Sequence, residues 1–396
     1  MAQISLQHAD AGAFISNARP DALYVHVPFC RHKCHYCDFY SIVDARNRQS
    51  DYARRLKEEA RACGEAVDAG GLRSIFVGGG TPTMLTPEEI SVVLNAITDA
   101  FNITPEGGLE WTVEANPETV DLERAHALVD GGVNRMSVGC QSFDPQLLET
   151  LERHHNPASV PEALATARQA GISRVSLDLI YGIPGSTLAQ WANDLEQAIA
   201  LAPSHLSCYC LTFEPGTPLH EKRRQGRIEP LDEQIQVEMY HYTVARLAEA
   251  GFAQYEISNW ARPDELCEHN LAYWQNKDWL PLGPAAAGHV QGARWRNLPR
   301  LDAWLEAGPF SPIVDVELPD PRRRASERLM LGFRLMSGFS ETELAQILEA
   351  DPPRHEARMK VINAAIDEGL IEKSGGRVRF TASGVLLADG FLSDLL

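Results

Sequence analysis

The chain has 396 residues, of which 44% are hydrophobic and 23% charged, so it is neither disordered nor collagen-like in composition. Its formal net charge of −18 is poorly suited to binding nucleic acid or an anionic membrane by electrostatics alone. No apolar stretch approaches the roughly 20 residues of a membrane-spanning helix. The N-terminal residues lack the pattern of a secretory signal. We therefore expect a cytoplasmic protein that does not insert into membranes.

The first two thirds of the chain alternate between β-rich runs and amphipathic helical patterns. Strands are predicted at residues 22–27, 73–78, 109–115, 134–139, 173–182, 205–212 and 253–258. Helices are predicted at residues 48–66, 87–101, 121–130, 158–170, 187–200 and 231–249. Thr86 with Glu89 and Thr187 with Gln190 have the spacing of capping boxes. Such a series predicts an α/β fold, and because its seventh unit runs into loop we expect an incomplete (β/α) TIM-like barrel.

The last third of the chain has a different pattern. Residues 259–300 are rich in Trp, Asn, Pro and Gly and have no clear period. From about residue 320, three helices are followed by a hairpin with Gly375 and Gly376 at its turn, which predicts a winged-helix-like α+β domain. This domain is slightly acidic, which favours a structural or partner-docking role over DNA binding. The predicted divisions are a tail (1–20), the partial barrel (21–260), a connecting segment (261–315) and the C-terminal domain (316–396).

Three of the eight cysteines, Cys30, Cys34 and Cys37, lie close together in the loop after the first predicted strand. Their C-x3-C-x2-C spacing allows three thiolates to hold three irons of a [4Fe–4S] cluster and leave the fourth iron open. A zinc ion with His32 or His35 as fourth ligand is the alternative. The position of the loop favours the cluster, because loops that follow barrel strands open onto the face where active sites of barrels lie. The cysteines at 63, 140, 208 and 210 are interpreted as small buried hydrophobic residues.

The cysteine motif and five later motifs, in this order, resemble the radical S-adenosylmethionine (SAM) superfamily. The later motifs are Gly78-Gly79-Gly80-Thr81-Pro82, Glu114-Ala-Asn-Pro, Ser137-Val-Gly-Cys-Gln141-Ser-Phe, Asp178-Leu-Ile-Tyr-Gly182-Ile-Pro184 and Cys267-Glu-His269-Asn270-Leu-Ala-Tyr273-Trp274. Within the superfamily they are similar to the coproporphyrinogen dehydrogenase-like branch and, inside it, to the HemW-type heme chaperones. The resemblance implies a radical SAM barrel with a [4Fe–4S] cluster, SAM on the open iron, and an electron donor that reduces the cluster so that SAM is cleaved to a radical.

The resemblance also implies which residues bind SAM. The positions that match are Tyr24, Tyr36, Gly79, Gly80, Thr81, Glu114, Gln141, Arg153 and Asp178. In this interpretation Glu114 accepts hydrogen bonds from the ribose hydroxyls and Arg153 pairs with the SAM carboxylate. The glycines let the backbone approach the ligand, and the two tyrosines shape the cluster and adenine pocket. By residue type alone, the alternatives are ordinary structural roles for Gln141, Arg153 and Asp178, an exposed strand-end acid at Glu114, core packing of the two tyrosines and a strand-end turn at the glycines.

The segment from His269 to Trp274 resembles the HNxxYW motif of the heme-chaperone group. Imidazole is a common axial ligand of heme iron, and Tyr and Trp offer flat faces to a porphyrin. We therefore expect His269 to contact heme, with Cys267 as a second possible ligand. The alternative is that His269 only satisfies protein groups. Ala287 stands where the family usually has a histidine, and the next histidine is His289.

Two features separate the chaperones from the oxidative enzymes of this branch. The enzymes have a further cysteine where this chain has Phe39, and they carry a long N-terminal arm, whereas 23 residues precede Tyr24 here. The resemblance thus implies a chaperone that binds heme and transfers it to acceptor proteins. The alternative function is a radical SAM oxidoreductase of porphyrin metabolism that acts on a porphyrin precursor. Nucleic-acid modification is disfavoured by the net charge.

Overall fold

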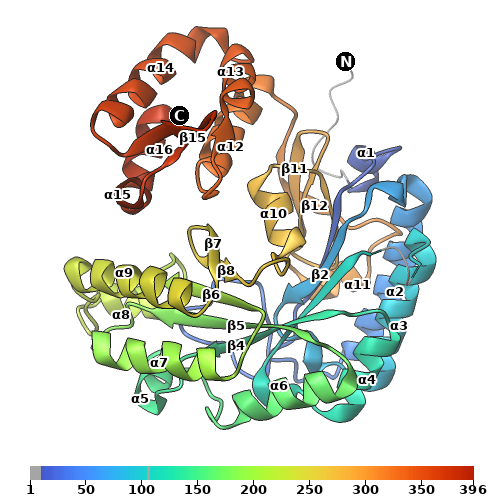
Figure 1. Cartoon of the computed structure of the whole chain (residues 1–396). Coiled ribbons are helices and arrows are strands. Elements are labelled where there is room, and N and C mark those ends of the chain that lie inside the picture. Colours follow the sequence, from blue (N-terminus) through green and yellow to red (C-terminus); the bar gives the residue numbers. More distant parts are fainter. Residues whose placement is uncertain (1–9, 105–107) are drawn as a thin grey trace.

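Six βα units, one after another, build the parallel half of a large curved sheet (Figure 1). The computed structural model describes residues 10–104 and 108–396, so residues 1–9 of the expected tail lie outside it. Strands β1 to β6 pair in chain order and in parallel. Their bounds are β1 Ala22–Val27, β2 Ser74–Gly79, β3 Glu110–Ala115, β4 Arg135–Gln141, β5 Arg174–Tyr181 and β6 His205–Cys210. These strands are largely buried, as expected where helices cover one face and a cavity is enclosed by the other.

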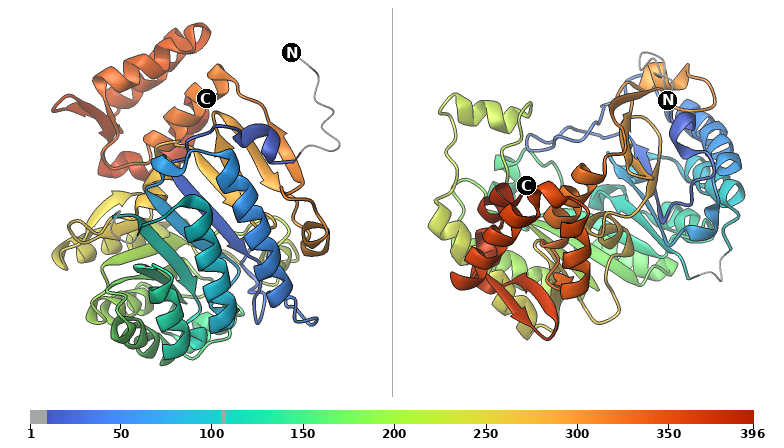
Figure 2. Two further views of the ribbon diagram at one scale, coloured as in Figure 1. Left: turned by 90° about the vertical axis from the view of Figure 1, so that its right-hand side faces the viewer. Right: turned by 90° about the horizontal axis from the view of Figure 1, so that it is seen from above.

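Helices pack on the outer face of this half of the sheet (Figures 1 and 2). The long ones are α2 Gln49–Ala66, α3 Pro87–Phe101, α4 Leu122–Asp130, α6 Ser159–Ala170, α7 Leu188–Ala200 and α9 Glu233–Glu249. Shorter elements are α1 Gly12–Ile15, α5 Pro145–Thr150, α8 Pro218–Arg224 and the 3-10 turns η2 Ala69–Gly71, η3 Pro82–Met84 and η5 Pro117–Thr119. The capping boxes of α3 and α7 both form, with reciprocal hydrogen bonds between side chain and backbone. The predicted helices are therefore confirmed nearly to the residue.

The barrel is incomplete, as predicted. The 12-stranded sheet has the order β12-β11-β10-β9-β1-β2-β3-β4-β5-β6-β8-β7, and in the described part of the chain its edge strands β7 and β12 do not pair. The added strands are β7 Ala253–Glu256, β8 Asn259–Ala261, β9 Trp279–Leu282, β10 Ala287–Val290, β11 Ala293–Asn297 and β12 Ile313–Glu317. Strand β9 joins β1 in parallel, whereas β8 joins β6 antiparallel.

The segment expected to be irregular, residues 259–300, in fact supplies strands β8 to β11 together with helix α10 Glu268–Trp274. The strands have only three to five residues each, which is too short for an alternating pattern to be recognised. They are held by large buried side chains such as Trp260, Leu282 and Trp295. Helix α11 Leu301–Leu305 follows, and its Trp304 side chain is fully buried in the core.

The C-terminal helices gather in a separate body at one end of the molecule (Figures 1 and 2, red). Helices α12 Pro321–Gly332, α13 Glu341–Glu349, α14 Pro352–Asp367, α15 Ala382–Leu386 and α16 Ala388–Leu395 surround a sheet of order β13-β15-β14. Its strands are β13 Phe339–Ser340, β14 Ile371–Ser374 and β15 Arg377–Phe380. Gly375 and Gly376 have φ of 59° and 75° at the hairpin turn, as a two-residue hairpin loop requires. The winged-helix-like arrangement is confirmed. None of the helices described is long and apolar enough to cross a membrane.

Candidate cluster and cofactor site

The cysteine loop leaves β1 at the carboxyl edge of the sheet and returns beside its own start. The Cys30 N–H donates to the Ile42 carbonyl at 2.9 Å, and the Ile42 N–H donates to the Pro28 carbonyl at 2.8 Å. Inside the loop, the Cys37 N–H donates to the Cys34 carbonyl at 3.2 Å. Phe29 is 1% exposed and anchors the start of the loop in the core. The backbone therefore holds the three cysteines in place without any added group.

The three thiols share one electrostatic environment. Burial, together with the charges of the other two thiols, raises the pKa of Cys37 to about 11. Burial likewise raises the pKa of Cys30, while hydrogen bonds from Thr81 and Ser41 oppose that rise. The Arg153 guanidinium contacts the Cys34 sulfur at 3.7 Å and supplies positive charge to the group. Thiolates at this site thus need a further cation, which is what an iron cluster provides.

The donor set of the loop suits an iron–sulfur cluster. Three cysteines in one loop, with the Arg153 guanidinium beside the Cys34 sulfur, can hold three irons of a [4Fe–4S] cluster and leave the fourth iron open. A structural zinc ion requires a fourth protein ligand in addition to the three thiolates. The residues present therefore fit a [4Fe–4S] cluster.

The glycine run at the end of β2 packs against protein rather than standing open. Gly79 has φ of 101°, and a Cβ there would lie 2.3 Å from the His26 ring. A Cβ on Gly80 would lie 2.7 Å from the carbonyl oxygens of Val27 and Phe29. The Gly79 N–H donates to the Glu114 carboxylate at 3.0 Å. The glycines thus let the ends of β1, β2 and β3 approach closely, and they orient Glu114.

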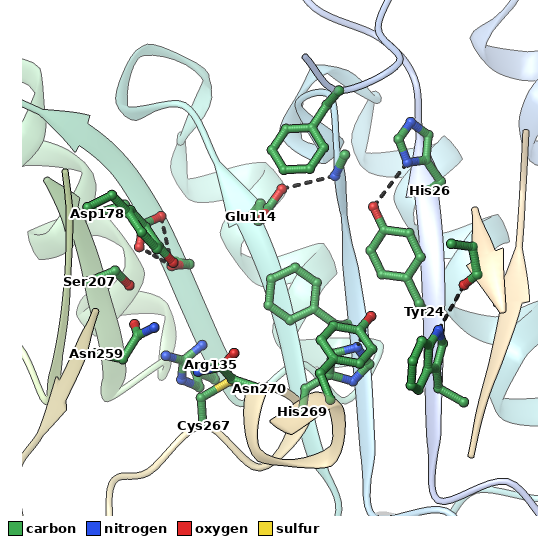
Figure 3. A pocket seen from close by; sticks show the side chains of 18 of the residues that line it. Tyr24, His26, Glu114, Arg135, Asp178, Ser207, Asn259, Cys267, His269 and Asn270 are labelled. Atoms are coloured by element: carbon green, nitrogen blue, oxygen red, sulfur yellow. Dashed lines mark hydrogen bonds between the residues drawn. The ribbon is translucent and has the colours of Figure 1, made fainter. Parts of the chain in front are cut away.

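Two half-buried acids face each other across the end of the sheet (Figure 3). Glu114 comes from β3 and Asp178 from β5, and both Asp178 oxygens accept from the Ser137 hydroxyl at 3.1 Å. Burial raises the pKa of Glu114 to about 7, and the Asp178 charge adds to the rise. Burial also raises the pKa of Asp178, against hydrogen bonds from Ser207 and Ser137. Such a pair is stabilised by a ligand that brings hydroxyl donors or positive charge.

A cavity of about 560 Å³ lies inside the open barrel, over these two acids. One side of it is aromatic, with Tyr24, Phe76, Tyr273 and Trp279. The other side is polar and includes Glu114, Asp178, Arg135, Ser207 and Asn259 (Figure 3). A cavity with one apolar wall and a few convergent polar groups is typical of a cofactor or small-molecule site.

The HNxxYW segment forms the floor of the aromatic side. The His269 ring is 1% exposed and stacks on Phe76 at a centroid distance of 5.1 Å. Its Nδ1 shares a hydrogen bond with the Ser74 hydroxyl at 3.0 Å, and its Nε2 shares one with the Tyr273 hydroxyl at 2.8 Å. Burial lowers the pKa of His269 to about 3, so the ring is neutral at ordinary pH. The ring therefore reaches the cavity, but both of its nitrogens are already bonded.

Comparison with known proteins places these features in a family. Residues 24–198 match the family described as the Radical SAM superfamily, and residues 320–387 match the family described as the HemN C-terminal domain. The heme chaperone HemW of Mycobacterium tuberculosis H37Rv is 34% identical over 383 residues, which cover 96% of this chain and 95% of that protein. The chain belongs to the HemW family.

Other relatives agree with this assignment. HemW of Bacillus subtilis is 32% identical and covers 94% of this chain and 99% of that protein. A radical S-adenosyl methionine domain-containing protein 1 of Bos taurus mitochondria is 35% identical over 72% of this chain and 66% of that protein. The coproporphyrinogen III oxidase HemN of Escherichia coli has the same fold, with a TM-score of 0.82, 22% identity, and coverage of 100% of this chain and 93% of that chain. Membership in the radical SAM superfamily implies a [4Fe–4S] cluster and SAM.

The structure distributes the family's expected SAM residues over two neighbouring cavities. Tyr24, Gly79, Glu114 and Asp178 line the large cavity together with His269. Thr81 and Arg153 line a smaller cavity of about 240 Å³ that also includes Cys34. Gly80 packs against the backbone carbonyls of Val27 and Phe29, at the start of the cysteine loop.

Two further expected SAM residues are not among those that line either cavity. Gln141 ends β4 with φ of 65°, beside the carbonyl of Gly139 that accepts from Arg153 at 2.9 Å. Tyr36 packs on a small apolar cluster with Leu151 and Ile180. A role of either residue in SAM binding stays a prediction.

Some cavity residues of this HemW relative were not singled out from the sequence. Arg135 begins β4 and is 2% exposed, and its guanidinium donates to the Thr112 hydroxyl at 3.4 Å. A charged residue at the start of an otherwise apolar strand was the available signal. Ala287 lines the cavity, whereas His289 is buried against Trp279 and bonds the Lys277 carbonyl.

Proposed function

We propose that the protein is a heme chaperone, which binds heme in the large cavity and transfers it to acceptor proteins. The observation that carries the proposal is the position of the HNxxYW segment, whose His269 and Tyr273 line the same cavity as Glu114 and Asp178. Curated relatives of similar length carry the name heme chaperone HemW. Their names support the proposal, and the cavity supplies a place for the ligand.

The chemistry of the cavity walls suits heme. Its porphyrin plane is apolar and requires flat apolar faces, which Phe76, Tyr273 and Trp279 offer. Its propionates are anionic and require cations, and both Arg135 and Arg296 line the cavity. Phe39 is 60% exposed and Tyr209 44% exposed at this cavity, so each has an aromatic face available to a large ligand.

We further propose that Cys30, Cys34 and Cys37 hold the [4Fe–4S] cluster and that SAM binds beside it. Bound there, the cluster supplies one-electron reduction. Arg153 stabilises the thiolates through its contact with the Cys34 sulfur at 3.7 Å. Glu114 is oriented by the Gly79 N–H and can accept from hydroxyl groups of SAM.

The test is a heme titration of protein that has been reconstituted with the cluster under anaerobic conditions, performed with and without SAM. Saturation near one heme per chain with a Soret band is expected, followed by a shift of that band to the position of the holo-acceptor when an apo-hemoprotein is added. Replacement of Trp279 by Ala should weaken heme binding while iron content is preserved. Decarboxylation of coproporphyrinogen by the cluster-loaded protein with SAM and a chemical reductant, without heme transfer, would establish the oxidoreductase alternative instead.

A further inference from the structure

A second group of metal-binding side chains lies beside the cysteine loop, outside the residues used so far. His32 belongs to the loop, while Glu152 and His154 follow α5, 120 residues further along the chain. One ligand atom from each of these three residues lies within 4.8 Å of the other two. No other group of three or more such residues meets this criterion in the described part of the chain.

The atoms of this group are close to the distances that a bound ion requires. The His154 Nε2 lies 3.3 Å from one Glu152 carboxylate oxygen, and the His35 Nδ1 lies 3.8 Å from the other. The His32 and His154 rings stack at a centroid distance of 4.2 Å. Bonds of about 2.0–2.2 Å to a tetrahedral zinc place its ligand atoms roughly 3.4 Å apart. Small side-chain rotations would therefore suffice to close the group around an ion.

Two ring nitrogens of the loop histidines have no hydrogen-bond partner in the part of the chain that the structure describes, which is consistent with a site for a metal ion. Within the described residues, His32 Nε2 and His35 Nδ1 are buried atoms without a hydrogen-bond partner. Buried imidazole nitrogens are normally bonded to protein, water or metal. The side chain of His154 is 60% exposed, so an ion can enter from solvent.

The backbone holds the two loops together at this point. The His35 N–H donates to the Leu151 carbonyl at 3.3 Å, which places the cysteine loop against the residues before Glu152. Glu152 itself has φ of 52°, a conformation that non-glycine residues rarely adopt. The turn thus directs Glu152 toward the histidines and the next residue, Arg153, toward Cys34.

We propose that His32, Glu152 and His154 form a binding site for a divalent transition-metal ion such as Zn²⁺, with His35 next to it as a further nitrogen donor. Two or three imidazoles and one carboxylate are the donor set that zinc prefers outside thiolate sites. The site is distinct from that of the iron–sulfur cluster, and it clamps the cysteine loop to the loop that carries Arg153.

One neighbouring positive charge disfavours binding of a cation, so its removal should strengthen zinc binding where the other substitutions weaken it. The Lys222 ammonium lies 3.8 Å from the Glu152 carboxylate. A cation at this position repels Zn²⁺ and competes for Glu152. Replacement of Lys222 by Gln should therefore tighten zinc binding, by up to about 30-fold for a unit charge removed about 4 Å from a divalent ion in water.

The experiment is a calorimetric Zn²⁺ titration of anaerobically cluster-loaded protein, in which the cysteines are already occupied. We expect one zinc per chain, weakened at least about tenfold by His154→Gln and by Glu152→Gln. His241→Gln, which changes an exposed histidine on α9, is the matched control and should bind as the unmodified protein does. Iron content reports whether each variant still folds and carries its cluster.

A second background separates this site from the cluster. In a chain with Cys30, Cys34 and Cys37 all changed to Ser, one zinc should still bind and should still be weakened by His154→Gln. Equal zinc affinity in His154→Gln, Glu152→Gln and the unmodified protein would overturn the proposal, as would weaker binding in Lys222→Gln. Because heme is absent from both titrations, neither result depends on the chaperone function.

Discussion

The cysteine loop and the HNxxYW segment both carry histidine and cysteine side chains beside a cavity, the loop beside the smaller one and the segment beside the large one, but their polar atoms are bonded in opposite ways. In the segment, His269 uses both ring nitrogens within the protein, and Glu110 accepts from the His269 N–H and the Cys267 thiol. In the loop, His32 Nε2 and His35 Nδ1 lack partners among the described residues. The two loop histidines thus need an added group to satisfy their ring nitrogens, whereas the segment's histidine is satisfied within the protein, and among the described residues of the segment the buried Trp274 indole N–H lacks a partner. We infer that the segment offers ring faces to a ligand more readily than lone pairs.

The largest effect should come from the loop. Replacement of Cys30, Cys34 or Cys37 by Ala should abolish the broad visible absorption of the reconstituted protein, because three ligands are the minimum for a cluster with one open iron. Iron and sulfide analysis of each variant is the measurement.

Cys63→Ala is the matched control for this prediction. Cys63 is 1% exposed within α2, and burial raises its pKa well above that of a free thiol, so it is not a ready ligand. Loss of the cluster in this variant, with retention in Cys34→Ala, would contradict the assignment of ligands.

Replacement of the carboxylate that binds the backbone of the HNxxYW segment should mainly lower the free energy of unfolding. Glu110 has a side chain that is 2% exposed, and it pairs with Arg174 at 3.1 Å in addition to holding the segment's backbone. Glu110→Gln should lower the free energy of unfolding by about 3 kcal/mol, since it removes one partner of a buried ion pair. Urea unfolding is the measurement.

The same arginine provides the control. Arg174 also pairs with Glu265 at 2.8 Å, where both side chains are partly exposed. Glu265→Gln should cost at most about 1 kcal/mol. Equal losses in the two variants would show that the segment is not held by its buried carboxylate.

A smaller effect is expected at the cavity acids, which lie between the two regions. Asp178→Ala should weaken SAM binding about tenfold, the value of one lost hydrogen bond to a charged group, and leave iron content unchanged. Equilibrium binding of SAM to the cluster-loaded protein is the measurement. Loss of iron in parallel with SAM would place Asp178 with the cluster instead.

Much of the barrel could be predicted because each βα unit repeats a local pattern. The cap at Thr86 and the buried strand before Glu114 are both decided by neighbours within a few residues in sequence. The family motifs then placed Glu114 at the end of the third strand and Asp178 in the fifth, and both line one cavity.

The remaining features depend on contacts between distant parts of the chain. Strands β8 to β11 are too short to show a period, and their pairing is decided by tertiary packing. The approach of His154 to His32 joins two loops that have no shared motif. The hydrogen bonds that occupy both nitrogens of His269 come from Ser74 on β2 and from Tyr273 on its own helix. Only the first of these partners lies far away in sequence, and residue type alone identifies neither.

The smallest effect concerns the pH dependence of stability. In the folded state burial lowers the pKa of His269 to about 3, whereas an unfolded histidine titrates near 6.5. Below pH 6.5 the unfolded chain therefore binds a proton that the folded chain excludes, and stability falls as the pH falls toward 3. One such group costs about 1.4 kcal/mol per pH unit once the unfolded histidine is fully protonated. His26, with a pKa lowered to about 4 by burial, acts in the same direction, and Glu114, with a pKa raised to about 7, acts against them between pH 4.5 and 7.

Because several groups titrate together, the comparison is made between variants. His269→Gln should show a shallower fall of unfolding free energy between pH 5.5 and pH 4 than the unmodified chain, by about 1 kcal/mol per pH unit. Tyr273→Phe removes a hydrogen bond but keeps the buried ring, so it should lose stability while retaining the steep slope. An unchanged slope in His269→Gln would mean that the folded protein admits the proton. The ring nitrogens would then be accessible, and His269 could act as an axial ligand. The contrast between a bonded histidine in the segment and unbonded histidines in the loop would be wrong.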